Sequence, residues 1–156
     1  MSEPGREPTR DRIQLWVSLP VVPERVWAEI GAFDAIAAWH PEVASAELAE
    51  LEGETHRHLR TGDGGLFLDR LIESGPHHYT YETVDGPLPL WDHRATLSCV
   101  AEEGGCHVFW LAVFEEEDPT VDDIVEGFFR AGLEALAERY GRPARAAARR
   151  GRKGGG

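Results

Sequence analysis

The segment TVDDIVEGFFRAGLEALAERYG, residues 120–141, holds the longest helical pattern of the chain. Its apolar residues recur every three or four positions, which is typical of an amphipathic helix that packs on a core. Thr120 and Asp123 resemble a capping box, and Gly141 ends the pattern. The sequence therefore predicts one long C-terminal helix. One of its apolar faces carries Ile124, Phe128, Ala131 and Ala135.

Strand patterns fill the chain before this helix. An alternating apolar segment begins at Arg12 and stops at Pro20. Six later segments are rich in β-forming residues and are separated by short turns such as GDGG, residues 62–65. Connections this short predict an antiparallel meander. The six segments are residues 43–51, 55–61, 66–73, 77–84, 92–100 and 106–114.

Two short helical segments separate the first strand from the others. One opens at Pro23 and ends near Gly31, and the other has Asp34 as its predicted N-cap and stops before Pro41. This order predicts an α+β fold in which a seven-stranded antiparallel curved sheet wraps around the long C-terminal helix. A helix about 10 Å across cannot fill the hollow of so wide a sheet. We therefore expect a ligand-binding cavity between helix and sheet.

We expect one domain over residues 12–140, between a flexible leader at residues 1–11 and a basic disordered tail at residues 141–156. The net charge is −12, although Arg139 and the residues after it supply seven basic side chains and no acidic one. The acidic body repels nucleic acids and anionic membranes. We expect neither as a partner, while contact of the tail with nucleic acid stays an alternative.

The chain also lacks the sequence features of secreted, membrane-spanning, disulfide-rich and zinc-binding proteins. Its N-terminal residues have no apolar middle of a signal peptide, and no run of about 18 apolar residues occurs. We therefore expect a cytoplasmic protein, either a monomer or a homodimer. Cys99 and Cys106 are too few for a disulfide framework or a zinc site. We expect buried free thiols, no metal and no cofactor.

Several segments resemble a known superfamily when they are taken in their order along the chain. They are VWAEIGAFDAIAAWHPEV at 26–43, HRHLRTGDGGLFLDRLIE at 56–73, YTYETVDGPLPLWDHRATL at 79–97 and VFWLAVF at 108–114, followed by the final helix. This series resembles the START-like (SRPBCC) superfamily and, within it, the polyketide cyclase/dehydrase and lipid-transport family. The resemblance covers residues 12–140. It implies the Bet v 1-like helix-grip fold and an internal cavity for a small molecule.

Strand alternation predicts which side chains line this cavity. If Asp69 faces inward, every second residue of its strand does so too, and the neighbouring strands follow by pairing. The predicted inward set is Arg57, Leu59, Thr61, Phe67, Asp69, Leu71, Tyr79, Tyr81, Thr83, His93, Ala95, Leu97 and Cys99.

The resemblance adds residues that periodicity does not decide. In the related plant hormone receptors, a pocket lysine falls at His40 and a pocket glutamate falls at Asp69. The family pattern also turns Trp110 and Phe114 inward, and Phe128 of the final helix is expected to close the hollow. Leu88 and Trp91 lie in the segment that gates the receptor pocket, so they form either an apolar lid or a rigid connection.

The predicted wall is aromatic and suits flat, conjugated or polycyclic ligands. We hypothesise an enzyme that catalyses the cofactor-free cyclisation and dehydration of such a molecule, as polyketide cyclases and aromatases do. His40 or His93 would transfer the proton, with Asp69 orienting the ring. Arg57 or a tyrosine would hold the enolate oxygen.

Other interpretations stay open. Arg57 and Asp69 could form only a buried ion pair that holds the hairpin, His93 could be an ordinary buried histidine, and the tyrosines could be only wall. The protein could be a non-catalytic carrier or sensor of a small molecule or lipid. It could also bind a partner protein through its acidic segment, residues 115–126, or its tail.

Overall fold

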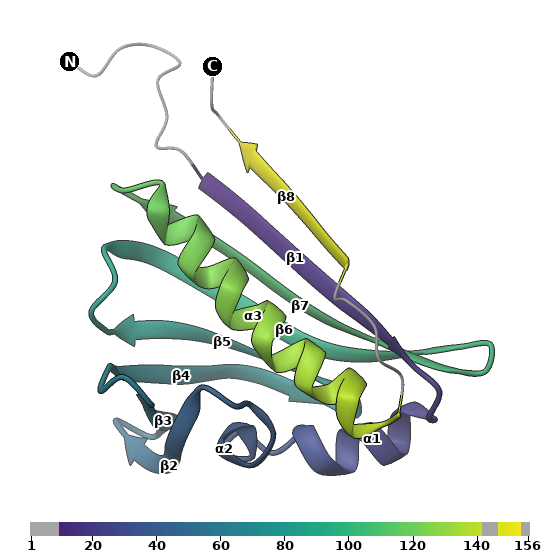
Figure 1. Ribbon diagram of the computed structural model, residues 1–156. Coiled ribbons are helices and arrows are strands. Elements are labelled where there is room, and N and C mark those ends of the chain that lie inside the picture. Colours follow the sequence, from purple (N-terminus) through teal and green to yellow (C-terminus); the bar gives the residue numbers. More distant parts are fainter. Residues whose placement is uncertain (1–9, 142–146, 154–156) are drawn as a thin grey trace.

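The computed structural model describes residues 10–141 and 147–153 of the protein. These residues form three helices and one eight-stranded antiparallel sheet, and α3 lies across one face of the sheet (Figure 1). The strand order is β2-β3-β4-β5-β6-β7-β1-β8. The elements are β1 (Arg10–Leu19), α1 (Pro23–Ile30), α2 (Ile36–Trp39), β2 (Val43–Leu51), β3 (Glu54–Thr61), β4 (Leu66–Gly75), β5 (His78–Asp85), β6 (Leu90–Glu102), β7 (Gly105–Glu116), α3 (Thr120–Arg139) and β8 (Ala147–Lys153).

The predicted α+β architecture is confirmed, including its antiparallel meander and long terminal helix. The inward register is also as predicted on β6, where every second residue from His93 to Cys99 is buried. The residues between them are exposed or only partly buried. Such alternation is expected of a strand with one face on the core. Cys99 and Cys106 are buried free thiols, as expected.

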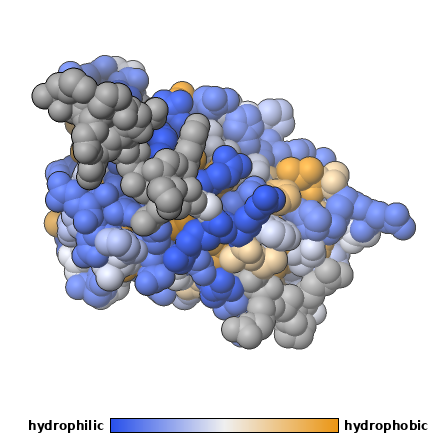
Figure 2. All heavy atoms as spheres, turned by 90° about the horizontal axis from the view of Figure 1, so that it is seen from above, coloured by the Kyte–Doolittle hydropathy of each residue, from blue (hydrophilic) through white to orange (hydrophobic). Residues whose placement is uncertain are grey.

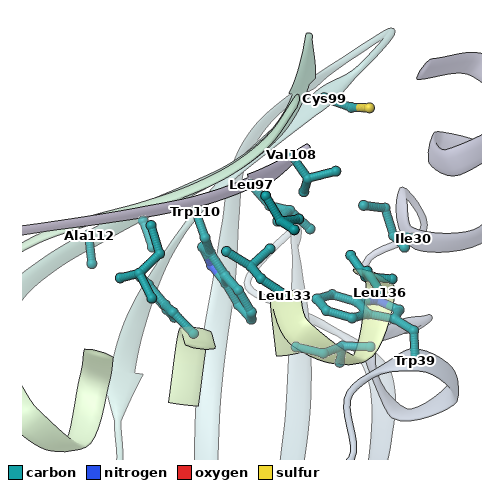
Figure 3. Close-up of a cluster of buried hydrophobic side chains, with 14 of the residues drawn as sticks. Ile30, Trp39, Leu97, Cys99, Val108, Trp110, Ala112, Leu133 and Leu136 are labelled. Atoms are coloured by element: carbon teal, nitrogen blue, oxygen red, sulfur yellow. The ribbon is translucent and has the colours of Figure 1, made fainter. Parts of the chain in front are cut away.

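Helix α3 packs mainly against β1 and β7 and closes only one side of the curved sheet. Trp110 of β7 points from the sheet toward α3 and belongs to the buried cluster that also holds Leu133 and Leu136 (Figure 3). Its indole stacks on the ring of Phe129, with ring centroids 4.3 Å apart. The buried helix face is thus the one centred on Phe129 and Leu133. Ile124, on the neighbouring face, is 49% exposed.

The two predicted side-chain caps are wrong. Thr120 is the first residue of α3 and not its cap, and its backbone N–H donates to Oδ1 of Asp118 at 3.0 Å. Helix α2 begins at Ile36, after Ala35, so Asp34 does not cap it. In both places an Asp or Thr with good capping chemistry lies within two residues of the true boundary, which is the usual precision of such signals.

The sheet has eight strands and not seven, because residues 147–153 of the predicted disordered tail form β8 along the edge of β1. Strand pairing needs only backbone N–H and C=O groups, which an Ala-, Arg- and Gly-rich segment supplies without an apolar pattern. Arg150 of β8 also binds the carboxylates of Glu126 and Asp123 on α3, at 2.6 and 3.1 Å.

The predicted leader is also shorter than expected. Arg10 and Asp11 belong to β1, where they pair with both β7 and β8. Residues 1–9 of the predicted leader and residues 142–146 and 154–156 of the predicted tail lie outside the described residues.

The surface reflects the high share of charged residues in the chain. The face seen from above is predominantly hydrophilic, with small hydrophobic areas (Figure 2). In the described ranges, no helix combines the length and apolar character that crossing a membrane requires.

Candidate ligand-binding cavity

A cavity of about 1010 Å³ lies between α3 and the strands that α3 does not cover. Three connections and the first half of α3 surround it: Pro41 and Glu42 after α2, the turn at residues 62–65, and the β5–β6 connection that begins at Asp85. Because α3 packs mainly on β1 and β7, space is left between this helix and the inner face of β3, β4 and β5. The expected hollow therefore exists, at the upper end of the size range of small-molecule sites.

The cavity brings together most of the residues predicted from the sequence. Those that line it are Arg57, Leu59, Phe67, Asp69, Tyr81, Leu88, Trp91, His93 and Phe128. Four others do not line it, because they are packed behind the wall or in the core. These are His40, Tyr79, Trp110 and Phe114.

Arg57 and Asp69 form a buried ion pair in the cavity wall. They lie opposite each other in the β3–β4 register, as the sequence predicted. Nη2 and Nε of Arg57 donate to Oδ2 of Asp69 at 2.7 and 3.1 Å, and the two side chains are 1% and 4% exposed. Nη1 donates to the backbone carbonyl of Phe33 at 2.8 Å. This dense pairing is what a buried charge requires.

Aromatic rings enclose the guanidinium of Arg57. Its central carbon lies 4.1 Å from the ring centroid of Phe33 and 4.9 Å from that of Tyr81, within cation–π range. Burial lowers the pKa of Arg57, but the Asp69 carboxylate together with Tyr79 and Tyr81 outweighs it, and the pKa is raised above its usual value. Arg57 is therefore a permanent cation whose charge is already balanced.

Thr83 connects this ion pair to His93; the sequence placed it on the inward face but did not single it out as a site residue. Its hydroxyl donates to Oδ1 of Asp69 at 2.8 Å, and its backbone N–H donates to Nδ1 of His93 at 3.1 Å. A continuous chain of polar contacts thus crosses β3, β4, β5 and β6. The signal for Thr83 was its inward place in the strand alternation, next to Tyr81.

His93 is a neutral hydrogen-bond donor in this arrangement. Burial lowers the pKa of His93 to about 4, although Asp69 acts in the opposite direction. Because Nδ1 accepts the Thr83 N–H, the proton of the neutral ring resides on Nε2. No described residue bonds to Nε2. His93 is therefore suited to donate to an oxygen of a ligand and poorly suited to act as the base that the sequence analysis proposed.

Tyr81 supplies a second donor at the cavity wall. Nε1 of Trp110 donates to the Tyr81 hydroxyl oxygen at 3.1 Å, which leaves the Tyr81 O–H for another acceptor. Burial raises the pKa of Tyr81, so the phenol stays protonated. Tyr79 is packed behind the cavity wall, where its hydroxyl accepts from Nη1 of Arg57 at 3.4 Å.

His40 is buried, as the break of the helix at Pro41 suggested, but it contacts α3 and does not line the cavity. Its Nε2 lies 2.7 Å from the backbone carbonyl of Phe128, and its Nδ1 accepts the N–H of Glu42 at 3.0 Å. Burial lowers the pKa of His40 to about 4. Both ring nitrogens are thus used inside the protein, so the proposed catalytic role of His40 has no free atom to perform it.

Gly132 provides the room that His40 occupies. A Cβ at residue 132 would lie 2.6 Å from Cδ2 of His40 and 3.0 Å from Trp39. The His40 ring also stacks on Phe128, with centroids 4.0 Å apart. His40 therefore joins the segment after α2 to the middle of α3.

The β5–β6 connection forms part of the cavity mouth. Trp91 is 42% exposed there, and Leu88 also lines the cavity. A Cβ at residue 86 would lie 2.8 Å from the ring of Phe67, so Gly86 lets this connection approach the wall closely. Asp92 adopts a left-handed φ of 51°, where the β6–β7 register shifts. The connection is packed against the wall in this state, and its movement as a lid stays a prediction.

Three carboxylates gather at a second place, between β1, β7 and α3. One carboxylate oxygen from each of Asp11, Glu116 and Asp122 lies within 4.8 Å of the other two. This group is outside the cavity lining, and all three residues take part in further interactions. Carboxylates alone do not identify a metal site.

Comparison with known proteins agrees with the fold. Residues 11–141 match the family described as polyketide cyclase / dehydrase and lipid transport. Comparison with curated proteins finds no significant match.

Comparison with solved structures finds proteins of similar fold and sequence. A Thermobifida fusca protein is 31% identical, with a TM-score of 0.73 over 86% of this chain and 95% of its own. XoxI from Bacillus cereus is 26% identical, with a TM-score of 0.77 over 83% and 94% of the two chains.

A more distant structure shares the fold alone. The Zhui aromatase/cyclase from Streptomyces sp. R1128 is 13% identical, with a TM-score of 0.72 over 84% of this chain and 93% of its own. The START-like resemblance of the sequence is confirmed by the family match together with these structures. The chain therefore belongs to the polyketide cyclase / dehydrase and lipid transport family.

Proposed function

We propose that the cavity binds a hydrophobic small molecule with a flat, conjugated or polycyclic ring system. The observation that carries this proposal is the combination of aromatic wall and buried donors around one cavity of about 1010 Å³. Phe67, Tyr81 and Phe128 present rings that pack edge-to-face or offset against a flat ligand. His93 and Tyr81 present an N–H and an O–H that suit a carbonyl or hydroxyl oxygen.

A second function, the cofactor-free cyclisation and dehydration of such a ligand, is favoured by the same donors. In this reaction a carbon next to a carbonyl loses a proton, and the enolate carbon bonds to a second carbonyl carbon, whose oxygen gains a proton. Loss of that hydroxyl with a neighbouring hydrogen then releases water. Nε2 of His93 and the Tyr81 hydroxyl would stabilise the enolate oxygen, which is where negative charge develops.

The cavity and not a histidine base would supply most of the rate enhancement. Holding a flexible chain in its reactive shape is worth several powers of ten in rate. The available proton acceptors are the carboxylates at the cavity mouth, such as Asp63 and Asp85. This replaces the sequence hypothesis in which His40 or His93 takes the proton.

Binding and chemistry are separated by one experiment. The purified protein is incubated with a series of conjugated polyketones, binding is followed by calorimetry, and the mixture is analysed by mass spectrometry. A product that has lost water, or a new ring isomer, supports the catalytic function. Binding with unchanged mass and isomer supports the binding function alone, and no binding of any member overturns the proposal.

Two tryptophan substitutions provide the matched control. Leu59→Trp fills the cavity from its wall, whereas Leu48→Trp adds the same ring at a 51% exposed position of β2 outside the lining. We expect Leu59→Trp to abolish binding and Leu48→Trp to retain it. Phe67→Trp, at a half-buried wall position, replaces Leu59→Trp if the latter does not fold.

A further inference from the structure

The cavity mouth carries four carboxylates from separate connections. Glu42 follows α2, Asp63 lies in the β3–β4 turn, and Asp85 and Asp92 flank the β5–β6 connection. All four residues line the cavity and are exposed. We call these four residues the acidic rim. Although they are distant in the sequence, the fold brings them to one opening.

None of the rim carboxylates has a basic partner within ion-pair distance among the described residues. Asp63 is held by the hydroxyl of Thr61 and the N–H of Gly65, which lowers the pKa of Asp63. Asp92 shares a hydrogen bond with Glu115 and thereby raises the pKa of Glu115. Arg10 donates to the backbone carbonyl of Asp92 at 3.5 Å and pairs with Glu115, but no described cation pairs with a rim carboxylate. The rim is therefore a predominantly negative surface at neutral pH.

The interior does not offset this negative charge. Arg57 is the only Arg or Lys among the described lining residues, and Asp69 already balances it. His93 is 7% exposed and neutral, so its free Nε2–H offers a hydrogen bond but no positive charge. An anionic ligand would thus find a negative entrance and no unpaired cation inside. A cationic group at the mouth would meet four carboxylates and the ring of Trp91.

We infer that the site, if it binds ring compounds as proposed above, selects them by charge and takes an arylalkyl amine, with its aromatic ring inside and its ammonium group at the acidic rim. The same ring with a neutral amide binds more weakly, and the same ring with a carboxylate binds most weakly. Charges about 8–10 Å apart in water still interact measurably at low salt. Four of them together favour the ammonium over the carboxylate by about tenfold or more at low salt.

The inference is tested with three ligands that share one naphthalene ring: naphthylmethylammonium, naphthamide and naphthoate. Their dissociation constants are measured by calorimetry at low and high salt. We expect the order ammonium, amide, carboxylate, with a spread of about tenfold or more at low salt that narrows as salt rises.

Two quadruple variants, each of which removes four negative charges, show whether the rim is responsible. Glu42→Gln/Asp63→Asn/Asp85→Asn/Asp92→Asn neutralises the rim. The control neutralises four exposed acidic residues outside the lining, in Asp34→Asn/Glu47→Gln/Glu103→Gln/Glu138→Gln. We expect the rim variant to bind all three ligands about equally and the control to keep the order.

The outcomes separate the two proposals. Charge selection is overturned if the unmodified protein binds the three ligands with equal affinity. It is also overturned if the control variant abolishes the order of affinities as fully as the rim variant does. Both outcomes leave the proposed binding function standing. If none of the three ligands binds at either salt concentration, both the charge selection and the proposed binding of ring compounds are wrong.

Discussion

The two ends of the interface between α3 and the sheet differ in how completely side chains fill it. At one end, Trp110, Leu133 and Leu136 belong to a closed core and have no exposed surface (Figure 3). At the other end, the inner face of β3–β5 borders a cavity of about 1010 Å³. One helix of limited width produces both ends, because it covers the strands it touches and leaves the others open.

Each end holds a buried histidine, and the two histidines show what separates a structural group from a candidate functional one. The pKa of both is lowered to about 4 by burial, and Nδ1 of both accepts a backbone N–H. They differ only at Nε2. In His40 this atom bonds to the Phe128 carbonyl, whereas in His93 it is left for a ligand. Burial and pKa are therefore poor guides here, and the partner of the second nitrogen decides.

The largest effect is expected from breaking the ion pair in the cavity wall. Arg57→Met leaves Asp69 buried without its cation, which costs about 3–5 kcal/mol of unfolding free energy. Urea unfolding followed by circular dichroism measures this loss. The double variant Arg57→Met/Asp69→Leu should recover much of it. A loss below about 1 kcal/mol would mean that water screens the pair as it does at a surface.

The next effect is a dependence of stability on pH from the two histidines. The folded protein keeps both neutral down to pH about 4, whereas an unfolded histidine titrates near 6.5. The unfolded state therefore binds more protons between these values. Stability is fully present above pH 6.5 and falls as the pH drops toward 4, by up to roughly 3 kcal/mol for each histidine.

Single substitutions of the two histidines show how much of this pH dependence of stability each one causes. His40→Gln and His93→Gln should each make the urea midpoint depend less on pH. Each substitution should remove the loss of stability that its own histidine causes at low pH. A neutral ligand bound in the cavity should reduce the loss of stability at low pH that His93 causes. The loss that His40 causes should stay unchanged. Curves of the two variants that coincide with the unmodified protein between pH 4.5 and 6.5 would contradict the assigned histidine pKa values.

The smallest effect concerns packing at the closed end. Gly132→Ala places a methyl group 2.6 Å from His40, and overpacking of this kind costs about 1–3 kcal/mol. Helix propensity returns up to about 1 kcal/mol of that. Gly127→Ala, on the same helix with open space around it, should instead stabilise by up to about 1 kcal/mol. Thermal unfolding compares them, and a stabilising Gly132→Ala would show that His40 is not held against α3.

The sequence predicted the strands, their inward faces and the Arg57–Asp69 pair, because strand alternation is local and hairpin turns fix which residues oppose each other. It failed at His40, which the family resemblance assigned to the pocket. The distance between α2 and α3 depends on Gly132, which is 92 residues away in the chain. A local pattern does not encode such a contact.

Strand β8 was missed for a different reason. Its residues lack apolar alternation, and pairing depends on the free edge of β1 together with carboxylates on α3. These partners become visible only in three dimensions. The identity of Thr83 as the connection between Asp69 and His93 likewise needed the pairing of β4 with β5 and the position of β6.

The most direct test is a titration of the ¹⁵N-histidine-labelled protein with naphthamide, followed by NMR of the ring nitrogens. The ring assignments above predict that a guest in the cavity shifts Nε2 of His93, while both nitrogens of His40 keep their signals. A shift at His40 with none at His93, or saturable binding that changes neither ring, would contradict the assignment of the cavity and of its exposed donor.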